Sequence, residues 1–253
     1  MYNIYYKMLI KIKKFIFNIR YYILLFLLIL LVYLYYINKN NEGFDNNNDI
    51  ITFIIPTIGR DSLEKSINSI INQTNKNWKA IIIFDGIEPN ININDKRIKI
   101  ISIPKLGQSI NSAGLVRNEG MKIVDTKWIG FLDDDDFISD DYVEKFYQTI
   151  KENNHTGLDV LIFRMINCEN LILPPLNTDN FNVSQVGISF VMTKKLFDNG
   201  YIFTPSKIED FELLDKIRND KHKILISPYI TYYVRCNNEN KILEKGNEVK
   251  INF

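Results

Sequence analysis

The sequence predicts an α/β fold: a mainly parallel, Rossmann-like sheet flanked by helices and preceded by one transmembrane helix. Three observations lead to this prediction. From Ile50 onward, apolar runs of strand length alternate with stretches of helical periodicity. The apolar runs are nearly continuous, which is typical of strands that are buried on both faces of a parallel sheet. A separate and longer apolar run lies before this region, at residues 21–37.

The segment 21–37, YYILLFLLILLVYLYYI, contains no charged residue, glycine or proline. Its length is near the lower end of what a membrane-spanning helix needs, and tyrosines occupy both ends, as expected at two membrane–water interfaces. A cleaved signal peptide or a buried core helix fits less well, because no small-residue cleavage site follows and no period gives a polar face. We therefore expect a signal-anchor helix.

The charges on either side of this segment predict its orientation. Residues 1–20 carry five basic and no acidic side chains, whereas acidic residues outnumber basic ones over 38–49. The positive side stays in the cytoplasm. We therefore expect a single-pass type II membrane protein with a basic cytoplasmic tail at 1–20 and a polar stem at 38–49. The remaining region, 50–253, is then expected in an ER- or Golgi-type lumen.

Five apolar segments are predicted to be strands. Each is rich in isoleucine, valine or aromatic residues and has the length of one buried strand. Pro56 closes the first segment, and the turn pair Asp85-Gly86 closes the second. The five segments are 50–56, 78–86, 97–104, 127–133 and 158–166.

Three segments between these strands have the spacing of amphipathic helices. In the first, Leu63, Ile67 and Ile70 recur at helical spacing, and Asp61 is the expected N-cap. Ser139 is the expected opening residue of the third. The three segments are 61–73, 111–124 and 139–152.

Polar residues follow three of the predicted strands: Thr57–Arg60 after the first, Asp85 at the end of the second and Asp133–Asp136 after the fourth. Ligands bind beyond the carboxyl ends of parallel strands, so these residues are expected at one edge. Four adjacent carboxylates repel one another, and a hard divalent cation removes the conflict. A solvated acidic turn is the alternative, and the convergence weighs against it. The net charge of +1 gives no reason to expect a nucleic-acid partner.

Four ordered motifs resemble glycosyltransferase family 2, which has the GT-A fold. The resemblance covers about residues 51–235 and implies an inverting, hexosyltransferase-type enzyme that uses a nucleotide-sugar donor. By family frequency the donor is expected to be a UDP-sugar rather than a GDP-sugar. The acceptor is a hydroxyl on a glycan, protein or lipid. The motifs are FIIPTIGR, SINSIINQTNKNWKAIIIFDG, LVRNEGMKIVDTKWIGFLDDDDF and IEDFELLDKI.

The resemblance also implies a set of donor-contacting residues. In chain order they match the first nucleotide loop, a carboxylate that meets the uracil or ribose, the Arg-Asn pair beside the nucleotide pocket, and the first two aspartates of the DxD motif. These residues are Pro56, Thr57, Arg60, Asp85, Arg117, Asn118, Asp133 and Asp134.

The DxD match implies a manganese or magnesium ion that bridges the donor diphosphate. Asp135 is the foremost expected ligand, Asp133 supports it, and Asp136 either adds a ligand or caps a helix. A metal at this place offsets the charge of the leaving diphosphate as a Lewis acid. A histidine ligand that many GT-A enzymes carry after the last strand is absent here, where Cys236 follows Arg235. Whether Cys236 pairs with Cys168 stays open.

Glu209-Asp210 matches the family's acidic pair, whose aspartate is the usual catalytic base. Asp210 is therefore the expected proton acceptor, and Glu209 is the second candidate because its longer side chain reaches further. We expect backbone donors at the start of a helix to hold Asp210 and keep it ionised. As an isolated dipeptide, the pair also fits a simple helix cap.

Two other functions fit parts of the sequence. A processive polysaccharide synthase carries a Gln-x-x-Arg-Trp motif and further membrane spans. Neither Trp78 nor Trp128 follows an arginine, and no second span is visible, so this alternative is set aside. The second alternative is a catalytically degenerate GT-A domain that acts as a membrane-tethered glycan- or partner-binding module. The acidic residues at both the metal and the base positions argue against it.

Overall fold

The structure is a computed structural model that describes residues 21–22, 26–33, 50–106, 113–153 and 157–235. The chain divides into two compact units, Met1–Asn47 and Asn48–Phe253. In the first unit, residues 21–22 and 26–33 are helical and exposed. Over the described residues, none of the helices combines the length and the apolar character that crossing a membrane needs. The rest of the expected span, the basic tail, the stem and Cys236 lie outside the described residues.

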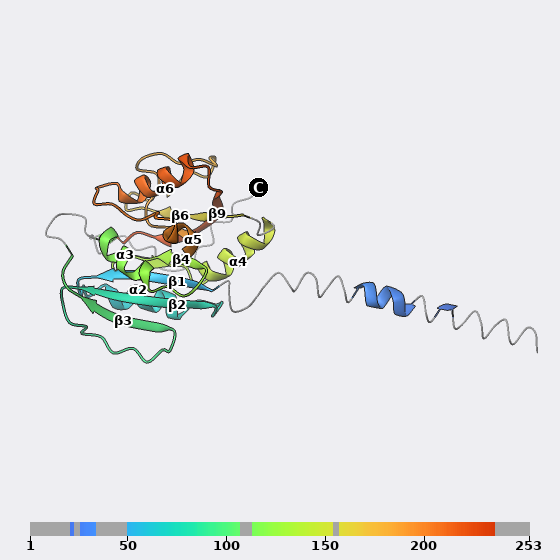
Figure 1. Ribbon diagram of the computed structural model, residues 1–253, viewed down its shortest axis with the longest axis horizontal. Coiled ribbons are helices and arrows are strands. Elements are labelled where there is room, and N and C mark those ends of the chain that lie inside the picture. Colours follow the sequence, from blue (N-terminus) through green and yellow to red (C-terminus); the bar gives the residue numbers. More distant parts are fainter. Residues whose placement is uncertain (1–20, 23–25, 34–49, 107–112, 154–156, 236–253) are drawn as a thin grey trace, which may run out of the picture. The chain divides into compact units, whose positions relative to one another are not determined.

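The second unit is built on one nine-stranded sheet (Figure 1). Its strand order is β3-β2-β1-β4-β8-β6-β9-β5, and β7 pairs with β6 beside this path. The strands are β1 (Ile51–Thr57), β2 (Trp78–Asp85), β3 (Ile98–Ile103), β4 (Trp128–Phe131), β5 (Phe137–Ile138), β6 (Val160–Ile166), β7 (Ile172–Leu173), β8 (Phe190–Thr193) and β9 (Ile224–Tyr233).

The described helices of this unit connect or follow these strands. Two begin later than the sequence predicts. Leu63 N donates to the Arg60 carbonyl at 3.1 Å, so a turn precedes the first helix, and its N-cap is Ser62 rather than Asp61. The Ser139 hydroxyl donates to Asp141 instead of opening a helix. The helices are α2 (Leu63–Ile71), α3 (Ala113–Lys122), α4 (Tyr142–Glu152), α5 (Lys194–Asp198) and α6 (Glu209–Asn219).

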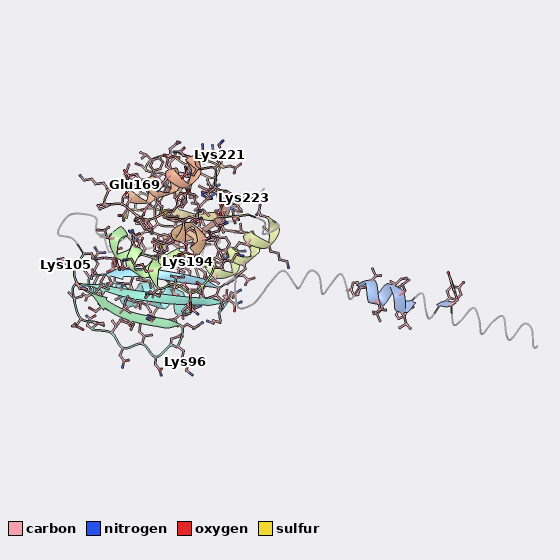
Figure 2. The ribbon with its side chains drawn as sticks, in the orientation of Figure 1. Lys96, Lys105, Glu169, Lys194, Lys221 and Lys223 are labelled. Carbon is pink, nitrogen blue, oxygen red and sulfur yellow. The ribbon has the colours of Figure 1, made fainter. Side chains whose placement is uncertain are left out.

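The half of the sheet formed by β1 to β4 is parallel throughout, as predicted. Strands β1, β2 and β4 are apolar and almost fully buried, whereas the edge strand β3 is partly exposed, and α3 packs on β1 and β2. The packing is close: a Cβ on Gly120 of α3 would lie 2.6 Å from Ile83 Cδ1 and 2.8 Å from Ile54 Cγ2. Charged side chains such as Lys96, Lys105 and Lys221 lie at the periphery of the unit (Figure 2).

The other half of the sheet is mixed, so the prediction of a mainly parallel sheet is wrong there. β8 is antiparallel to both β4 and β6, whereas β6 and β9 are parallel. The direction reverses at the short turn between β6 and β7, where Asn167 N donates to the Leu171 carbonyl at 3.1 Å, and β8 keeps the direction of β7 because both are antiparallel to β6. Because β8 opposes both neighbours, β4 and β6 point the same way and end at the same edge of the sheet.

Candidate active site

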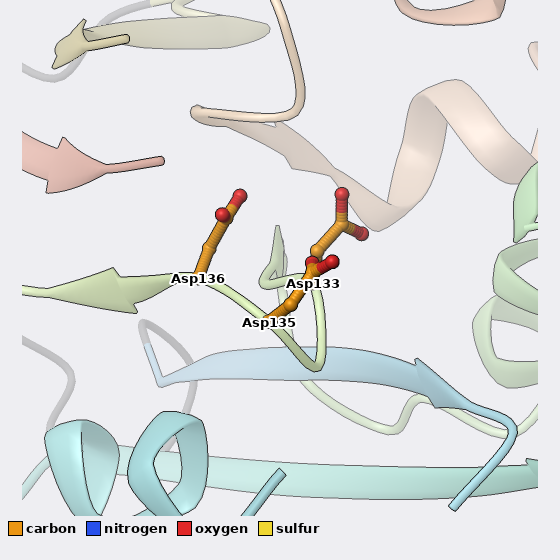
Figure 3. A group of neighbouring side chains, drawn as sticks. All are labelled: Asp133, Asp135 and Asp136. Atoms are coloured by element: carbon orange, nitrogen blue, oxygen red, sulfur yellow. The ribbon is translucent and has the colours of Figure 1, made fainter. Parts of the chain in front are cut away.

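Four consecutive aspartates, Asp133–Asp136, form a tight turn after β4, and we call this turn the acidic loop. Leu132 N donates to the Ile54 carbonyl at 3.1 Å, which extends the pairing of β4 with β1. The chain then turns, and the backbone N–H of Asp136 donates to the Asp133 carbonyl at 3.2 Å. Asp133, Asp135 and Asp136 project to the same side of this loop (Figure 3). The end of β4 thus gathers the carboxylates, as the sequence predicts.

Two members of the acidic loop are buried and bound to the protein itself. Asp134 accepts hydrogen bonds from the Thr57 hydroxyl and from Arg60 Nη1, both at 2.7 Å. Asp136 accepts from the Tyr232 hydroxyl at 2.8 Å and from the backbone N–H of Arg235 at 2.9 Å. These bonds tie the loop to the end of β1 on one side and to β9 on the other.

The carboxyl group of Asp136 has a strongly raised pKa, and its surroundings explain why. Burial raises its pKa to about 7, and the nearby Asp133 carboxylate adds to the rise, against the hydrogen bonds from Arg235 and Tyr232. The helix-cap alternative for this residue does not hold, because α4 begins only at Tyr142 with Asp141 at its N-cap.

The other two members of the loop are accessible. The side chains of Asp133 and Asp135 are 32% and 43% exposed. One oxygen from each, together with one from Asp136, forms a group in which all oxygens lie within 4.8 Å of one another. An octahedral magnesium ion places oxygens at most about 4 Å apart, so a small contraction of this group would suit it. The group therefore fits a hard divalent cation.

The charge balance around the acidic loop also favours a bound cation. The six acidic side chains of the site face two arginines, which leaves up to four negative charges in excess when all are ionised. Burial and the neighbouring carboxylates raise the pKa of Asp135, against the pull of Arg60. A bound cation would offset this repulsion. The residues concerned are Asp133, Asp134, Asp135, Asp136, Glu209 and Asp210, with Arg60 and Arg117.

One buried arginine joins the acidic loop to α6. Arg117, on α3, is 3% exposed and donates to Asp133 Oδ1 at 2.5 Å and to Glu209 Oε1 at 2.7 Å. Its Nη1 also lies 3.8 Å from Asp210 Oδ1. Burial acts to lower its pKa, but the three carboxylates outweigh it and raise the pKa above the ordinary value. Arg117 is thus a permanently charged bridge between the two acidic parts of the site.

Its neighbour Asn118 binds the segment that leads into α6. The Asn118 amide donates to the Phe203 carbonyl at 2.8 Å, and the Phe203 N–H donates to Asn118 Oδ1 at 3.0 Å. Both Arg117 and Asn118 are buried, and their hydrogen bonds go to other parts of the protein. The pair predicted beside the nucleotide pocket is therefore built into the wall of the site.

Glu209 and Asp210, which we call the α6 carboxylates, are the first two residues of α6. The Glu209 side chain is 11% exposed and the Asp210 side chain 26%. Burial raises the pKa of Glu209 to about 7 and that of Asp210 to about 6, while Arg117 opposes both shifts. Asp210 Oδ1 is buried without a hydrogen-bond partner, so backbone donors do not hold this oxygen as expected.

The remaining predicted residues lie at the ends of β1 and β2. Pro56 and Thr57 end β1 and are buried, and Asp85 ends β2. Asp85 accepts from the backbone N–H of Leu106 at 2.7 Å, which holds the segment after β3. No described hydrogen bond links Asp85 to the acidic loop. Next to it opens a cavity of about 510 Å³, lined by Gly86, Ile87, Glu88, Ser102, Ile103, Pro104 and Lys105.

Sequence reasoning missed two residues of the site. The Tyr232 hydroxyl accepts from the backbone N–H of Asp133 at 3.3 Å and donates to Asp136. Gly114, on α3, lies against Glu209. Tyr232 stands in an apolar strand and Gly114 in a helix, far from their partners in the sequence, so no local pattern signals either contact.

Comparison with known proteins defines the class of enzyme. The family model "Glycosyl transferase family 2" matches residues 52–218, which is more than half of the chain. The chain therefore belongs to glycosyl transferase family 2, as the motifs indicate.

Particular relatives are similar over shorter stretches. The poly(ribitol-phosphate) beta-N-acetylglucosaminyltransferase TarP of Staphylococcus aureus is 31% identical over 110 residues, 41% of this chain and 34% of TarP. The glycosyltransferase GlyA of Streptococcus pneumoniae is 34% identical over 112 residues, 41% of this chain and 15% of GlyA. The chain thus spans about a third or less of these relatives.

A solved structure shows the same fold. S. aureus TarS 1-349, in complex with UDP-GlcNAc, superposes with a TM-score of 0.56 at 17% identity, over 75% of this chain and 60% of that chain. The same TarS fragment has been solved with UDP. The likeness confirms a GT-A-like α/β fold for the second unit.

Proposed function

We propose that this protein is an inverting, divalent-metal-dependent transferase that moves a sugar from a UDP-sugar to an acceptor hydroxyl. The observation that carries the proposal is the Arg117 bridge. Arg117 donates to Asp133 of the acidic loop and to Glu209 of α6, and it thereby brings the cation-binding type of carboxylate group and the α6 carboxylates together where the strands end. Single-displacement glycosyl transfer needs both groups, one for the leaving diphosphate and one for the attacking hydroxyl.

The donor is proposed to lie along the ends of β1, β2 and β4. The cavity beside Asp85 would receive the uracil and ribose, and the half-exposed Arg60 would contact the diphosphate next to Asp135. Thr57 and Asp134 fix Arg60 and the acidic loop against each other. TarS has been solved in complex with UDP and with UDP-GlcNAc, so UDP-GlcNAc is the first donor to test.

Asp133 and Asp135 would hold manganese or magnesium, because they are the exposed members of the acidic loop. Asp136 is the third candidate, and both of its oxygens already accept hydrogen bonds. When bound, the metal supplies Lewis-acid stabilisation of the departing diphosphate.

The transfer itself is one step. The acceptor oxygen attacks the anomeric carbon as the bond from that carbon to the diphosphate oxygen breaks, and the acceptor proton passes to a carboxylate. Asp210 is the proposed acceptor of that proton. It is more exposed than Glu209, and it lies beyond hydrogen-bond distance of Arg117, whereas Glu209 accepts a hydrogen bond from it. A carboxylate free of such a bond is the better base.

A screen of nucleotide sugars tests the proposal. Purified protein is incubated with UDP-GlcNAc, other UDP-sugars and GDP-sugars in the presence of manganese, and release of the nucleoside diphosphate is measured. The proposal predicts turnover with a UDP-sugar that disappears in excess chelator. A protein that binds UDP with manganese but turns over no donor or acceptor would instead be the degenerate binding module, and full activity in excess chelator would refute the metal.

We also propose that residues 21–37 anchor the protein in a membrane with the catalytic domain on the luminal side. The uncharged apolar run and the basic residues before it support this orientation. In sealed microsomes, added protease is expected to spare the catalytic domain until detergent is present. Digestion of that domain without detergent would reverse the proposed orientation.

A further inference from the structure

Helix α3 contacts the approach to α6 through three residues on one face. Gly114, Arg117 and Asn118 are spaced as i, i+3 and i+4, which places them next to one another on a helix. All three are buried. Asn118 holds the backbone of Phe203, Arg117 holds the Glu209 carboxylate, and Gly114 lies against both of these partners.

Gly114 is required for space. A Cβ at this position would lie 2.3 Å from Glu209 Oε2 and 2.7 Å from Phe203 Cβ, distances that real Cβ atoms do not adopt. Its φ is not in the left-handed region, so the backbone itself does not demand glycine. Alanine is favoured over glycine inside helices, and the glycine here therefore has a packing reason.

The position of Glu209 determines which carboxylate receives the hydrogen bond from Arg117 Nη1. Arg117 Nη1 lies 2.7 Å from Glu209 Oε1 and 3.8 Å from Asp210 Oδ1, so the two carboxylates compete for one nitrogen. While Glu209 holds that nitrogen, Asp210 stays without a hydrogen bond from it. Displacement of Glu209 would let the guanidinium donate to Asp210, and that charge-assisted hydrogen bond would lower the basicity of the carboxylate that must accept a proton.

We propose that Gly114 is a positioning residue: its missing side chain seats Glu209 on Arg117 and thereby keeps Asp210 free. Arg117 and Asn118 belong to the same set of α3 contacts: they position Glu209 and Phe203 and do not bind the donor. This inference rests on the proposed function of the α6 carboxylates, and it concerns the contacts of α3 with Phe203 and Glu209 rather than the hydrogen bond from Arg117 to Asp133.

The experiment uses the full chain and the donor on which the wild type turns over. Gly114→Ala is expected to lower kcat at least tenfold, because the added methyl group displaces Glu209, while the Kd for UDP with manganese changes less than twofold. The control is Glu119→Ala on the same helix, where the side chain is partly exposed and, among the described residues, pairs with Lys122, and wild-type turnover is expected. Wild-type turnover in Gly114→Ala overturns the inference and leaves the proposed function untouched.

A double variant separates positioning from damage to the fold. Glu209→Asp shortens the side chain by one methylene and removes the carboxylate part of the clash with a Cβ at position 114, whereas the contact with Phe203 Cβ stays. Gly114→Ala/Glu209→Asp is therefore expected to have a kcat at least threefold above that of Gly114→Ala alone. Losses that simply multiply in the double variant would show that the two residues act independently and would contradict the proposal.

Arg117→Lys provides a second test that does not depend on Gly114→Ala folding. A lysine ammonium cannot bridge two carboxylates as a guanidinium fork does. We expect kcat to fall at least tenfold, with the Kd for UDP and manganese within twofold of the wild type. A parallel loss of UDP affinity would show that Arg117 acts on the donor, directly or through Asp133, and would overturn its assignment as a positioning residue of the α6 carboxylates.

Discussion

The two halves of the sheet contribute to the site in different ways. In the parallel half, β1, β2 and β4 all end at one edge, so the direction of the strands alone brings Thr57, Asp85 and the acidic loop there. In the mixed half, α6 follows an irregular segment and reaches the site through polar contacts from α3. The comparison teaches that the donor side is built by backbone topology, whereas the proposed base is placed by a few buried side chains.

Removal of the foremost proposed metal ligand has the largest expected effect, and it tests the parallel half of the sheet, where the donor is proposed to bind. Asp135→Asn removes a charged oxygen from the exposed part of the acidic loop. We expect turnover to fall about a thousandfold, since metal stabilisation of a leaving group contributes several kcal/mol. Donor turnover with saturating manganese is the measurement. Asp140→Asn, an exposed aspartate shortly after the loop, is the matched control and is expected to keep wild-type activity.

Removal of the proposed base tests the mixed half. Asp210→Asn is expected to lower kcat at least about a hundredfold, as is typical for the loss of a general base, with little change in donor affinity. Glu209→Gln is expected to be milder, because Gln can still accept the Arg117 hydrogen bond. Glu212→Gln, exposed in the same first turn of α6, is the control.

Two outcomes would change this assignment. Near-normal turnover in Asp210→Asn with an inactive Glu209→Gln would mean that Glu209 is the base. Normal turnover in both variants would reduce the α6 carboxylates to the start of a helix and leave the mechanism without a proton acceptor.

The pH dependence of turnover is expected to report on the α6 carboxylates, in the mixed half of the sheet. A base must be ionised, and burial raises the pKa values of the α6 carboxylates to about 6 and 7. We expect kcat at saturating metal to be constant above this range and to fall about tenfold per pH unit below it, with an apparent pKa that belongs to the coupled pair. If the fall in kcat at low pH persists unchanged in Asp210→Asn, the group that titrates is another residue.

The stability of the protein is expected to depend on pH with the opposite sign, and this is the smallest predicted effect. Both folded-state pKa values lie above the ordinary values of 4.5 and 3.8, so the folded protein binds more protons than the unfolded chain. This contribution to stability is present at low pH and is lost as the pH rises through about 6 to 7. At pH 7.5 in excess chelator, Glu209→Gln is expected to raise the Tm by about 2 °C. An unchanged or lower Tm would contradict the raised pKa of Glu209.

The difference between the halves also explains what the sequence could predict. Strands 78–86 and 97–104 match β2 and β3 closely, because isoleucine-rich runs with turn residues at their ends identify parallel strands; β2 is buried as predicted, whereas the edge strand β3 is only partly buried. The short strands β5, β7 and β8 were not predicted, since two to four residues carry no periodicity and their pairing depends on distant partners.

The same limit applies to the candidate site. Asp133–Asp136 could be found because the four carboxylates are adjacent and follow a predicted strand. The sequence did not reveal that Asp134 and Asp136 are internal anchors while Asp133 and Asp135 are exposed, because that division depends on Thr57 and Tyr232, from β1 and β9. A run of charged residues does not show which of its members will be buried by strands that are distant in the sequence.

The most direct test of the division between the two halves is a calorimetric titration of UDP, with and without manganese, into the wild type, Asp135→Asn and Asp210→Asn. The acidic loop is proposed to hold the metal and the donor, and the α6 carboxylates only the proton. We therefore predict that manganese strengthens UDP binding in the wild type and in Asp210→Asn by the same factor, and that this gain is lost in Asp135→Asn. Equal losses in both variants, or a full manganese effect in Asp135→Asn, would contradict the proposed separation of donor and base.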